Sequence, residues 1–252
     1  MPDFYDIIFE DDDLLIINKM ADVLSIPDRW NLDIPNLRSI LDEKYGKIFV
    51  VHRLDKETSG IMLFAKNAET HKYFNDLFEH QKIKKLYHVV VSGILQRNEL
   101  DVDIPVMTDP STKGKSIPSS RGKESLTKIK VLQRFKVATL IECDLITGRH
   151  HQIRVHCSAI GHPLLIDRMY GSKSEFMLSS IKRKFNLKKG TEERPIIERI
   201  TMHAHSLQFI HPKSEDEVTF TAEYPKDFSA LLQVLGKYSE IPDYLSNRAN
   251  FE

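Results

Sequence analysis

The sequence predicts an α+β fold in which a central, mostly antiparallel sheet is crossed by a cleft. Short runs rich in β-branched residues outnumber amphipathic helices, and they occur in adjacent pairs instead of alternating with helices along the whole chain. The chain has 252 residues, of which 41% are hydrophobic and 29% are charged. This composition is typical of globular proteins and excludes intrinsic disorder. We expect one domain over residues 1–252.

The first third of the chain is rich in strand signals. Two β-rich runs enclose the acidic turn at residues 10–13 and predict a hairpin. Asp33 as the cap and Pro35 in the first turn predict the start of a helix that Gly46 ends. Two apolar runs then enclose a polar loop, residues 52–60. The expected elements here are strands at 5–9 and 14–18, a helix at 33–45, strands at 48–51 and 61–65, a helix at 68–80 and a strand at 86–91.

The rest of the chain interrupts its strands with two irregular polar stretches. Residues 107–125 lack apolar periodicity and predict a loop, and the basic residues 172–199 predict an insertion that need not pack. Gly161 and Pro163 stop a helix, and the apolar spacing after Pro225 predicts a final amphipathic helix. The expected elements are strands at 127–132 and 139–145, a helix at 150–160, strands at 202–210 and 218–222, and a helix at 225–235.

Charge is distributed unevenly, although 36 basic residues balance 36 acidic ones. Residues 81–200 carry 23 basic and 12 acidic side chains, whereas residues 1–50 carry 5 and 11. The segments 113–136 and 182–194 concentrate the positive charge. Either segment could face the phosphates of a nucleic acid. The alternative is that charges distant in sequence intermix on the folded surface.

Several protein classes are excluded by composition. No apolar run approaches the roughly 20 residues of a spanning helix, so we expect no membrane partner. The acidic N-terminus has no basic region before an apolar run, unlike a secretory signal. Cys143 and Cys157 are too few for a disulfide framework and are expected to be small buried hydrophobes. We therefore expect a cytoplasmic protein.

The polar loop HRLDKETSG, residues 52–60, is the first candidate site, because loops held between rigid strands often carry catalytic groups. Asp55 could act as a nucleophile or a base, and Arg53 could hold a phosphate or fill a gap. The closing Thr-Ser-Gly offers hydroxyls and the permissive backbone of a tight turn. The alternative is that Asp55 only caps or forms this turn.

The stretch TGRHHQIRVH, residues 147–156, is the second candidate site. On a helix His150 and Arg154 are i, i+4 neighbours, and His151 and Arg154 are i, i+3 neighbours. Such a face suits a carboxylate or a phosphate. The histidines lack the spacing that places two imidazoles on one helical face for zinc, and no cysteine pair is nearby. We therefore expect no metal.

Both stretches resemble motifs of the RluA-type pseudouridine synthases. HRLDKETSG resembles the central H-R-L-D-x-x-T-S-G of that family, and residues 145–171 resemble its long motif L-x-T-G-R-T-H-Q-I-R-V-H-x-x-x-x-G-H-P-x-x-G-D-x-x-Y-G. The chain departs from the pattern at residues 20–22, at His150 and at Ile166, which leaves substrate choice more open than reaction type. Shorter matches lie at Asn18-Lys19, at residues 85–87 and at residues 202–212.

The resemblance implies isomerisation of a specific uridine in ribosomal or transfer RNA to pseudouridine, with the nucleotide flipped out of its stack. No redox change occurs, so no cofactor is implied. Asp55 would be the nucleophile or the base that starts glycosidic cleavage, and Arg154 would pair with its carboxylate. Tyr87 would stack on the uracil, and Arg53 would occupy the vacated space or grip the nucleotide. The other positions expected to bind substrate are His52, Thr58, Arg149, His151 and Gln152.

Two other functions share these features. One is a module that binds RNA without chemistry, which the retained Asp55, Tyr87 and Arg154 disfavour. The other is a nucleosidase that would release free uracil. We expect RNA as the partner, a monomer, and no separate N-terminal RNA-binding module. The sequence leaves open which RNA is modified, and whether Asp55 attacks the sugar, attacks the base or initiates elimination.

Overall fold

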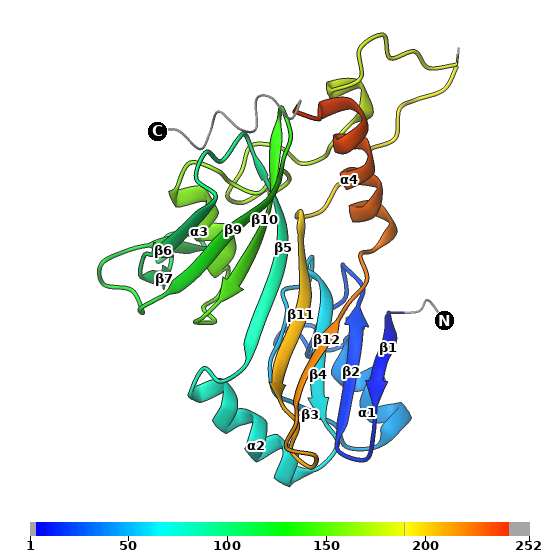
Figure 1. Cartoon of the computed structure of the whole chain (residues 1–252). Helices are drawn as coiled ribbons and strands as arrows, with labels where there is room; N and C mark the ends of the chain where they lie inside the picture. Colours follow the sequence, from blue (N-terminus) through cyan, green and yellow to red (C-terminus); the bar gives the residue numbers. More distant parts are fainter. Residues whose placement is uncertain (1–3, 189, 242–252) are drawn as a thin grey trace. The chain divides into compact units, whose positions relative to one another are not determined.

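The computed structural model describes residues 4–188 and 190–241, which divide into two compact units (Figure 1). The described residues of the first unit lie within Met1–Tyr87 and His203–Tyr224, and those of the second lie within His88–Met202 and Pro225–Glu252. The strand β5 (Lys84–Ser92) therefore contributes residues to both units. The expectation of one domain over the whole chain stays a prediction.

A mostly antiparallel sheet forms the first unit. The predicted hairpin is confirmed, because β1 (Tyr5–Glu10) and β2 (Leu14–Lys19) pair antiparallel. Residues Leu14–Ile17 are fully buried, as is nearly all of β4. Among the described strand pairs of this unit, β4 and β11 are the ones that run parallel. The strands pair in the order β1 (Tyr5–Glu10), β2 (Leu14–Lys19), β4 (Ser59–Ala65) and β11 (Met202–Ile210), with β3 (Phe49–Val50) on β4 and β12 (Glu217–Thr221) on β11.

The helices of the first unit are α1 (Leu37–Tyr45) and α2 (Ala68–Glu79). The predicted cap at Asp33 is wrong, because the side chain of Asn36 accepts the hydrogen bond from the backbone N–H of Ser39. Pro35 disfavours helical backbone at the residue before it, and Asn36 is still extended, with a parallel bridge to Leu24. The helix therefore begins only at Leu37.

In the second unit the pairs β6–β9, β9–β10 and β7–β8 are antiparallel as well, which agrees with the predicted fold class. Its three-stranded part has β9 between β6 and β10. The strand β6 and the hairpin β7–β8 are absent from the sequence-based expectation, and most of the hairpin falls in the expected loop at 107–125. The elements are β6 (Glu99–Asp103), β7 (Val106–Thr108), β8 (Ser116–Pro118), β9 (Leu126–Arg134), β10 (Ala138–Leu145), α3 (Gln152–Ala159), η1 (Leu178–Ser180) and α4 (Lys226–Ser239).

Two helix boundaries differ from expectation. The helix expected from residue 150 begins at Gln152, because His151 adopts a left-handed backbone with φ of 56°. The final helix continues through Gly236 to Ser239. Cys143 and Cys157 are buried free thiols, as expected. Within the described residues, every helix is too short or too polar to cross a bilayer.

Candidate active site

The ammonium of Lys19 ties the Asp55 loop to the end of β2. Its side chain is fully buried, although lysine is rarely buried without partners. Its ammonium donates to the carbonyl of Lys56, the residue after Asp55. The backbone N–H of Asp22 donates to the same carbonyl at 2.9 Å. The residue after Asp55 is therefore fixed by two donors. Lys19 itself donates to the carbonyl oxygens of Met20, Val23 and Lys56 at 2.8, 2.9 and 3.0 Å.

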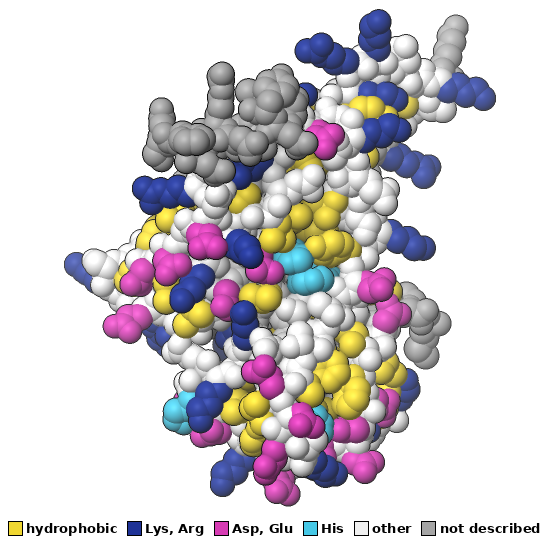
Figure 2. Space-filling model, viewed as in Figure 1, with side chains coloured by type: hydrophobic (Ala, Val, Ile, Leu, Met, Phe, Trp, Pro, Cys, Tyr) yellow, Lys and Arg dark blue, Asp and Glu magenta, His cyan; other side chains and the backbone are white. Residues whose placement is uncertain are grey.

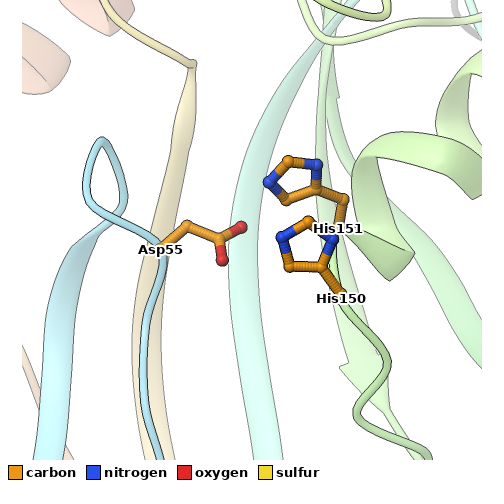
Figure 3. A group of neighbouring side chains, drawn as sticks. All are labelled: Asp55, His150 and His151. Carbon is orange, nitrogen blue, oxygen red and sulfur yellow. The ribbon is translucent and has the colours of Figure 1, made fainter. Parts of the chain in front are cut away.

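The residue before Asp55 is fixed in the same way. Ser25 Oγ donates to the Leu54 carbonyl at 2.7 Å and accepts from the Leu54 N–H at 3.1 Å. The Thr58 N–H donates to the Asp55 carbonyl at 3.1 Å and closes the turn. The half-buried side chain of Asp55 projects from this loop, as Figure 3 shows, while Arg53 is exposed. The loop backbone is thus rigid where it presents the carboxylate.

Tyr87, on β5, is coupled to Asp55 through charge. The tyrosine is 9% exposed. Burial raises the pKa of its hydroxyl well above the ordinary value, and the negative charge of Asp55 raises it further. The phenol is therefore neutral near pH 7 and offers a ring and a hydrogen-bond donor.

His52 holds the loop to β4. Its Nε2 accepts the backbone N–H of Leu63 at 2.9 Å, and its ring stacks on Phe78 with centroids 5.2 Å apart. Burial, with the charge of Lys85 as a smaller cause, lowers the pKa of His52 to about 3. The imidazole is neutral, and Nδ1 carries its proton. The expected substrate contact of His52 stays a prediction, but this geometry gives it a role in fixing the loop.

Ser59 and Gly60 belong to β4 rather than to the expected tight turn. Ser59 Oγ lies 3.0 Å from Nδ1 of His203, whose Nε2 lies 3.2 Å from the Ala222 carbonyl. Gly60 has φ of 120°, and a Cβ there would lie 2.1 Å from the carbonyl oxygen of Ala204. A side chain at this position is incompatible with the close approach of β4 and β11.

A buried ion pair anchors Arg154 in the second unit. Arg154 Nε and Nη2 donate to the two carboxylate oxygens of Asp167 at 2.7 and 2.8 Å, and the two residues are 3% and 0% exposed. Oδ1 also accepts the N–H groups of Met169 and Tyr170. Burial alone would raise the pKa of Asp167, but the hydrogen bonds and charge of Arg154 lower it below its ordinary value.

Tyr170 connects Arg154 to the two histidines that precede α3. Arg154 Nη1 lies 3.0 Å from His151 Nε2, so this nitrogen accepts and Nδ1 carries the proton. The Tyr170 oxygen lies 2.9 Å from Nδ1 and accepts the N–H of Ser116 at 2.7 Å. His150 stacks on His151 with centroids 3.8 Å apart (Figure 3), and its Nδ1 lies 3.0 Å from Ser116 Oγ.

Gln152 has its amide engaged within the protein. Its expected substrate contact stays a prediction, but the geometry gives it a role in shaping the turn before α3. Arg149 is exposed, and its Nε donates to the Glu124 carbonyl at 3.1 Å. The partners of the Gln152 amide are Thr147 Oγ1, the Arg149 N–H, the Leu126 carbonyl and Thr127 Oγ1, at 2.8 to 3.1 Å.

The candidate residues divide between the two units. Asp55 and Tyr87 lie in the first unit with His52, Arg53 and Thr58, whereas Arg154 lies in the second with Arg149, His151 and Gln152. The expected pairing of Arg154 with Asp55 stays a prediction. Sequence reasoning gave no role to Tyr170 and Asp167, although both lie in the long motif at 145–171. It also missed Ser25 and Ser116, for which no motif offered a signal.

Comparison with known proteins connects both units to one family. The family described as RNA pseudouridylate synthase matches residues 13–159, a range that contains Asp55, Tyr87 and Arg154. The chain belongs to the RNA pseudouridylate synthase family. This confirms the family and enzyme class that the sequence predicted.

Individual relatives extend the match along almost the whole chain. The dual-specificity RNA pseudouridine synthase RluA of Vibrio parahaemolyticus is 32% identical, over 95% of this chain and 92% of its own length. The ribosomal large subunit pseudouridine synthase D of Neisseria meningitidis serogroup B is 32% identical over 98% of this chain, which spans only 65% of that relative. The solved structure of human RNA pseudouridylate synthase domain containing 4 superposes with a TM-score of 0.68 at 25% identity, covering 94% of each chain, and confirms the predicted fold class.

Proposed function

We propose that this chain isomerises a specific uridine of ribosomal or transfer RNA to pseudouridine, with Asp55 as the group that starts the reaction. The Neisseria relative is named as a pseudouridine synthase of the large ribosomal subunit, and the Vibrio relative is named as a dual-specificity RNA pseudouridine synthase. The observation that carries the proposal is the half-buried Asp55 on a backbone fixed from both sides, with its charge coupled to the buried phenol of Tyr87. A rigid loop of this kind holds a carboxylate in one orientation toward a substrate.

The chemistry breaks one bond and forms another on the same nucleotide. The bond between N1 of uracil and C1′ of ribose breaks, the base turns, and C5 bonds to C1′. The proton that leaves C5 balances the proton that N1 acquires, so the reaction needs no oxidant, reductant, cofactor or metal. In each open route, namely attack on the sugar, attack on the base or elimination, Asp55 must begin as a carboxylate.

The other residues bind and orient. Tyr87 offers its ring for stacking on the uracil. Its raised pKa favours the phenol over a phenolate, so its hydroxyl is better suited to donate a hydrogen bond than to act as the resting base. Arg154 supplies the cation that an ionised, partly buried Asp55 requires. Exposed Arg53 and Arg149 are free to meet RNA phosphates or bases. We also propose that the chain is a monomer and acts in the cytoplasm.

A tritium-release assay tests this proposal. Transcripts of large-subunit ribosomal RNA and of a tRNA pool are made with uridine tritiated at C5, and formation of pseudouridine releases the label into water. We expect release by the wild-type chain, with pseudouridine and no free uracil among the digested nucleosides. Free uracil would instead identify a nucleosidase. Absence of both products on all transcripts, with RNA binding intact, would identify a non-catalytic module.

The Asp55→Asn variant assigns the catalytic group. Asn is nearly isosteric with Asp but has neither its negative charge nor its nucleophilicity. We expect this variant to bind RNA and to release no tritium. Substantial turnover by Asp55→Asn would show that another group starts the reaction.

A further inference from the structure

The second unit carries a long excursion between two paired residues. Phe176 and Ile197 form an antiparallel bridge, and both are 2% exposed. Of the 20 residues between them, 177–196, those that the structure describes form the short η1 and otherwise irregular backbone. Loops of this length in compact proteins commonly serve a function or remain disordered. We call residues 177–196 the basic excursion.

The positive charge of the basic excursion is not neutralised locally. It holds six basic residues and two acids, Glu192 and Glu193, and Lys189 lies outside the described residues. Glu193 accepts the backbone N–H of Ser179 at 2.8 Å. The described basic residues of the excursion form no ion pair within the described part of the chain, and four of them are exposed. These four are Arg183, Lys184, Lys188 and Arg194.

The end of α4 adds to this positive surface. Lys182 and Lys237 each place their ammonium over the ring of Tyr238, at 5.6 and 5.4 Å from its centroid. The excursion is the yellow-green loop at the top of Figure 1, and the protruding charged side chains at the top of Figure 2 are mainly basic. Excess charge of one sign on an exposed loop attracts partners of the opposite sign.

The other basic segment, residues 113–136, differs in this respect. Lys128 on β9 lies between Asp101 on β6 and Asp144 on β10, and Lys130 lies between Glu99 and Glu142 in the same way. Directly opposed residues share a face of a sheet, so acids flank both lysines. In addition, the guanidinium of Arg134 donates to the carbonyls of Leu95 and Gln96 and to Asn98. Much of the charge in this segment is therefore used within the protein.

We propose that the basic excursion binds the phosphates of the substrate RNA outside the modified nucleotide, and that the lysines of β9 do not. This inference rests on the proposed function for the identity of the partner. Such contacts position the RNA and add affinity regardless of base sequence.

Salt-dependent binding of a fluorescein-labelled 30-nucleotide oligouridylate tests the proposal. The full-length chain is compared with Lys184→Gln/Lys188→Gln and with the matched control Lys128→Gln/Lys130→Gln, which removes the same two charges. Each phosphate contact to a single strand contributes about 0.7 to the slope of log affinity against log salt concentration. We expect the first variant to lower this slope by about 1.4 and the control to leave it unchanged. The quadruple variant Arg183→Gln/Lys184→Gln/Lys188→Gln/Arg194→Gln should bind at least about tenfold more weakly at low salt.

Several results would overturn the proposal. One is a quadruple variant whose salt slope equals that of the wild type. Another is a β9 control whose salt slope falls as much as that of Lys184→Gln/Lys188→Gln, which would indicate a diffuse effect of net charge. A quadruple variant that keeps the RNA slope but loses binding to phosphatidylglycerol vesicles would assign the excursion to a membrane surface instead. Tritium release at saturating RNA separates this proposal from the proposed function. A wild-type chain that binds oligouridylate through the excursion but releases no tritium would refute only the latter.

Discussion

Replacing Asp167 by Asn tests whether the buried pair stabilises the second unit. Arg154 and Asp167 are 3% and 0% exposed and are joined by two hydrogen bonds of 2.7 and 2.8 Å. Removing one partner of such a pair leaves a buried charge uncompensated and costs about 3–5 kcal/mol of unfolding free energy. The Asn oxygen can still accept the N–H groups of Met169 and Tyr170, so we expect a loss near the lower end, about 3 kcal/mol.

Thermal unfolding followed by circular dichroism measures this loss. For a chain of this size, about 3 kcal/mol corresponds to a decrease of roughly 6–12 °C in Tm. The matched control is Asp227→Asn. Arg199 donates to Asp227 through the same two nitrogens at 2.6 and 2.8 Å, but the Asp227 side chain is 35% exposed. The Tm of the control variant should fall by less, because water reaches Asp227, screens the pair and replaces the missing partner. Equal decreases in the two variants, or a decrease below about 2 °C for Asp167→Asn, would refute the role given to burial.

The pH dependence of the Tm difference between wild type and Asp167→Asn gives a second check. The pKa of Asp167 is lowered from its ordinary value of 3.8 in the folded protein. A carboxyl with a lowered pKa contributes stability that is complete above its unfolded pKa and is lost as the pH falls through the folded value. The Tm difference between wild type and Asp167→Asn should therefore be constant from pH 5 to 7 and shrink below about pH 3.8. A difference that already declines between pH 6 and 5 would implicate another group.

Three further variants test residues of the first unit. Tyr87→Phe keeps the stacking ring, so RNA binding should persist and kcat for tritium release should fall by less than the roughly 100-fold that loss of a general acid–base group causes. Gly60→Ala places a Cβ 2.1 Å from the Ala204 carbonyl oxygen, so circular dichroism should show a lowered Tm or no folded protein. Lys19→Met removes one donor from each of three buried or part-buried carbonyls; it should destabilise by about 1–3 kcal/mol in urea unfolding and lower kcat more than KM.

The sequence predicted most strands because their burial follows a local pattern. The run at 14–17 is apolar and ends in two β-branched residues, and it became the fully buried part of β2. The hairpin β7–β8 could not be found in the same way, because its strands are only three residues each, too short to show an alternating pattern. It is held by distant groups, such as the Tyr170 hydroxyl on the Ser116 N–H. Contacts of this kind depend on the folded chain and leave no periodicity.

The candidate site, too, depends on contacts that the sequence alone does not reveal. Motif resemblance located Asp55, Tyr87 and Arg154, but the sequence could not show that Asp167 engages the Arg154 guanidinium in two hydrogen bonds. It also could not distinguish residues that meet a substrate from residues that hold the loop. Ser25 illustrates this best, since its hydroxyl forms two hydrogen bonds with the backbone of Leu54 and no motif includes it.

Hydrogen-bonding capacity divides the motif residues into two kinds. Lys19, His52 and Gln152 have polar atoms engaged by backbone or neighbouring side chains, and those of Asp167 are engaged by Arg154. We expect a residue of this kind to act mainly through the position of another group, so its replacement should change stability along with turnover. Exposed Arg53 and Arg149 are the other kind, since their guanidinium groups keep donors for a ligand. Their replacement should weaken RNA binding at constant Tm, and this split can be measured without knowing which uridine is modified.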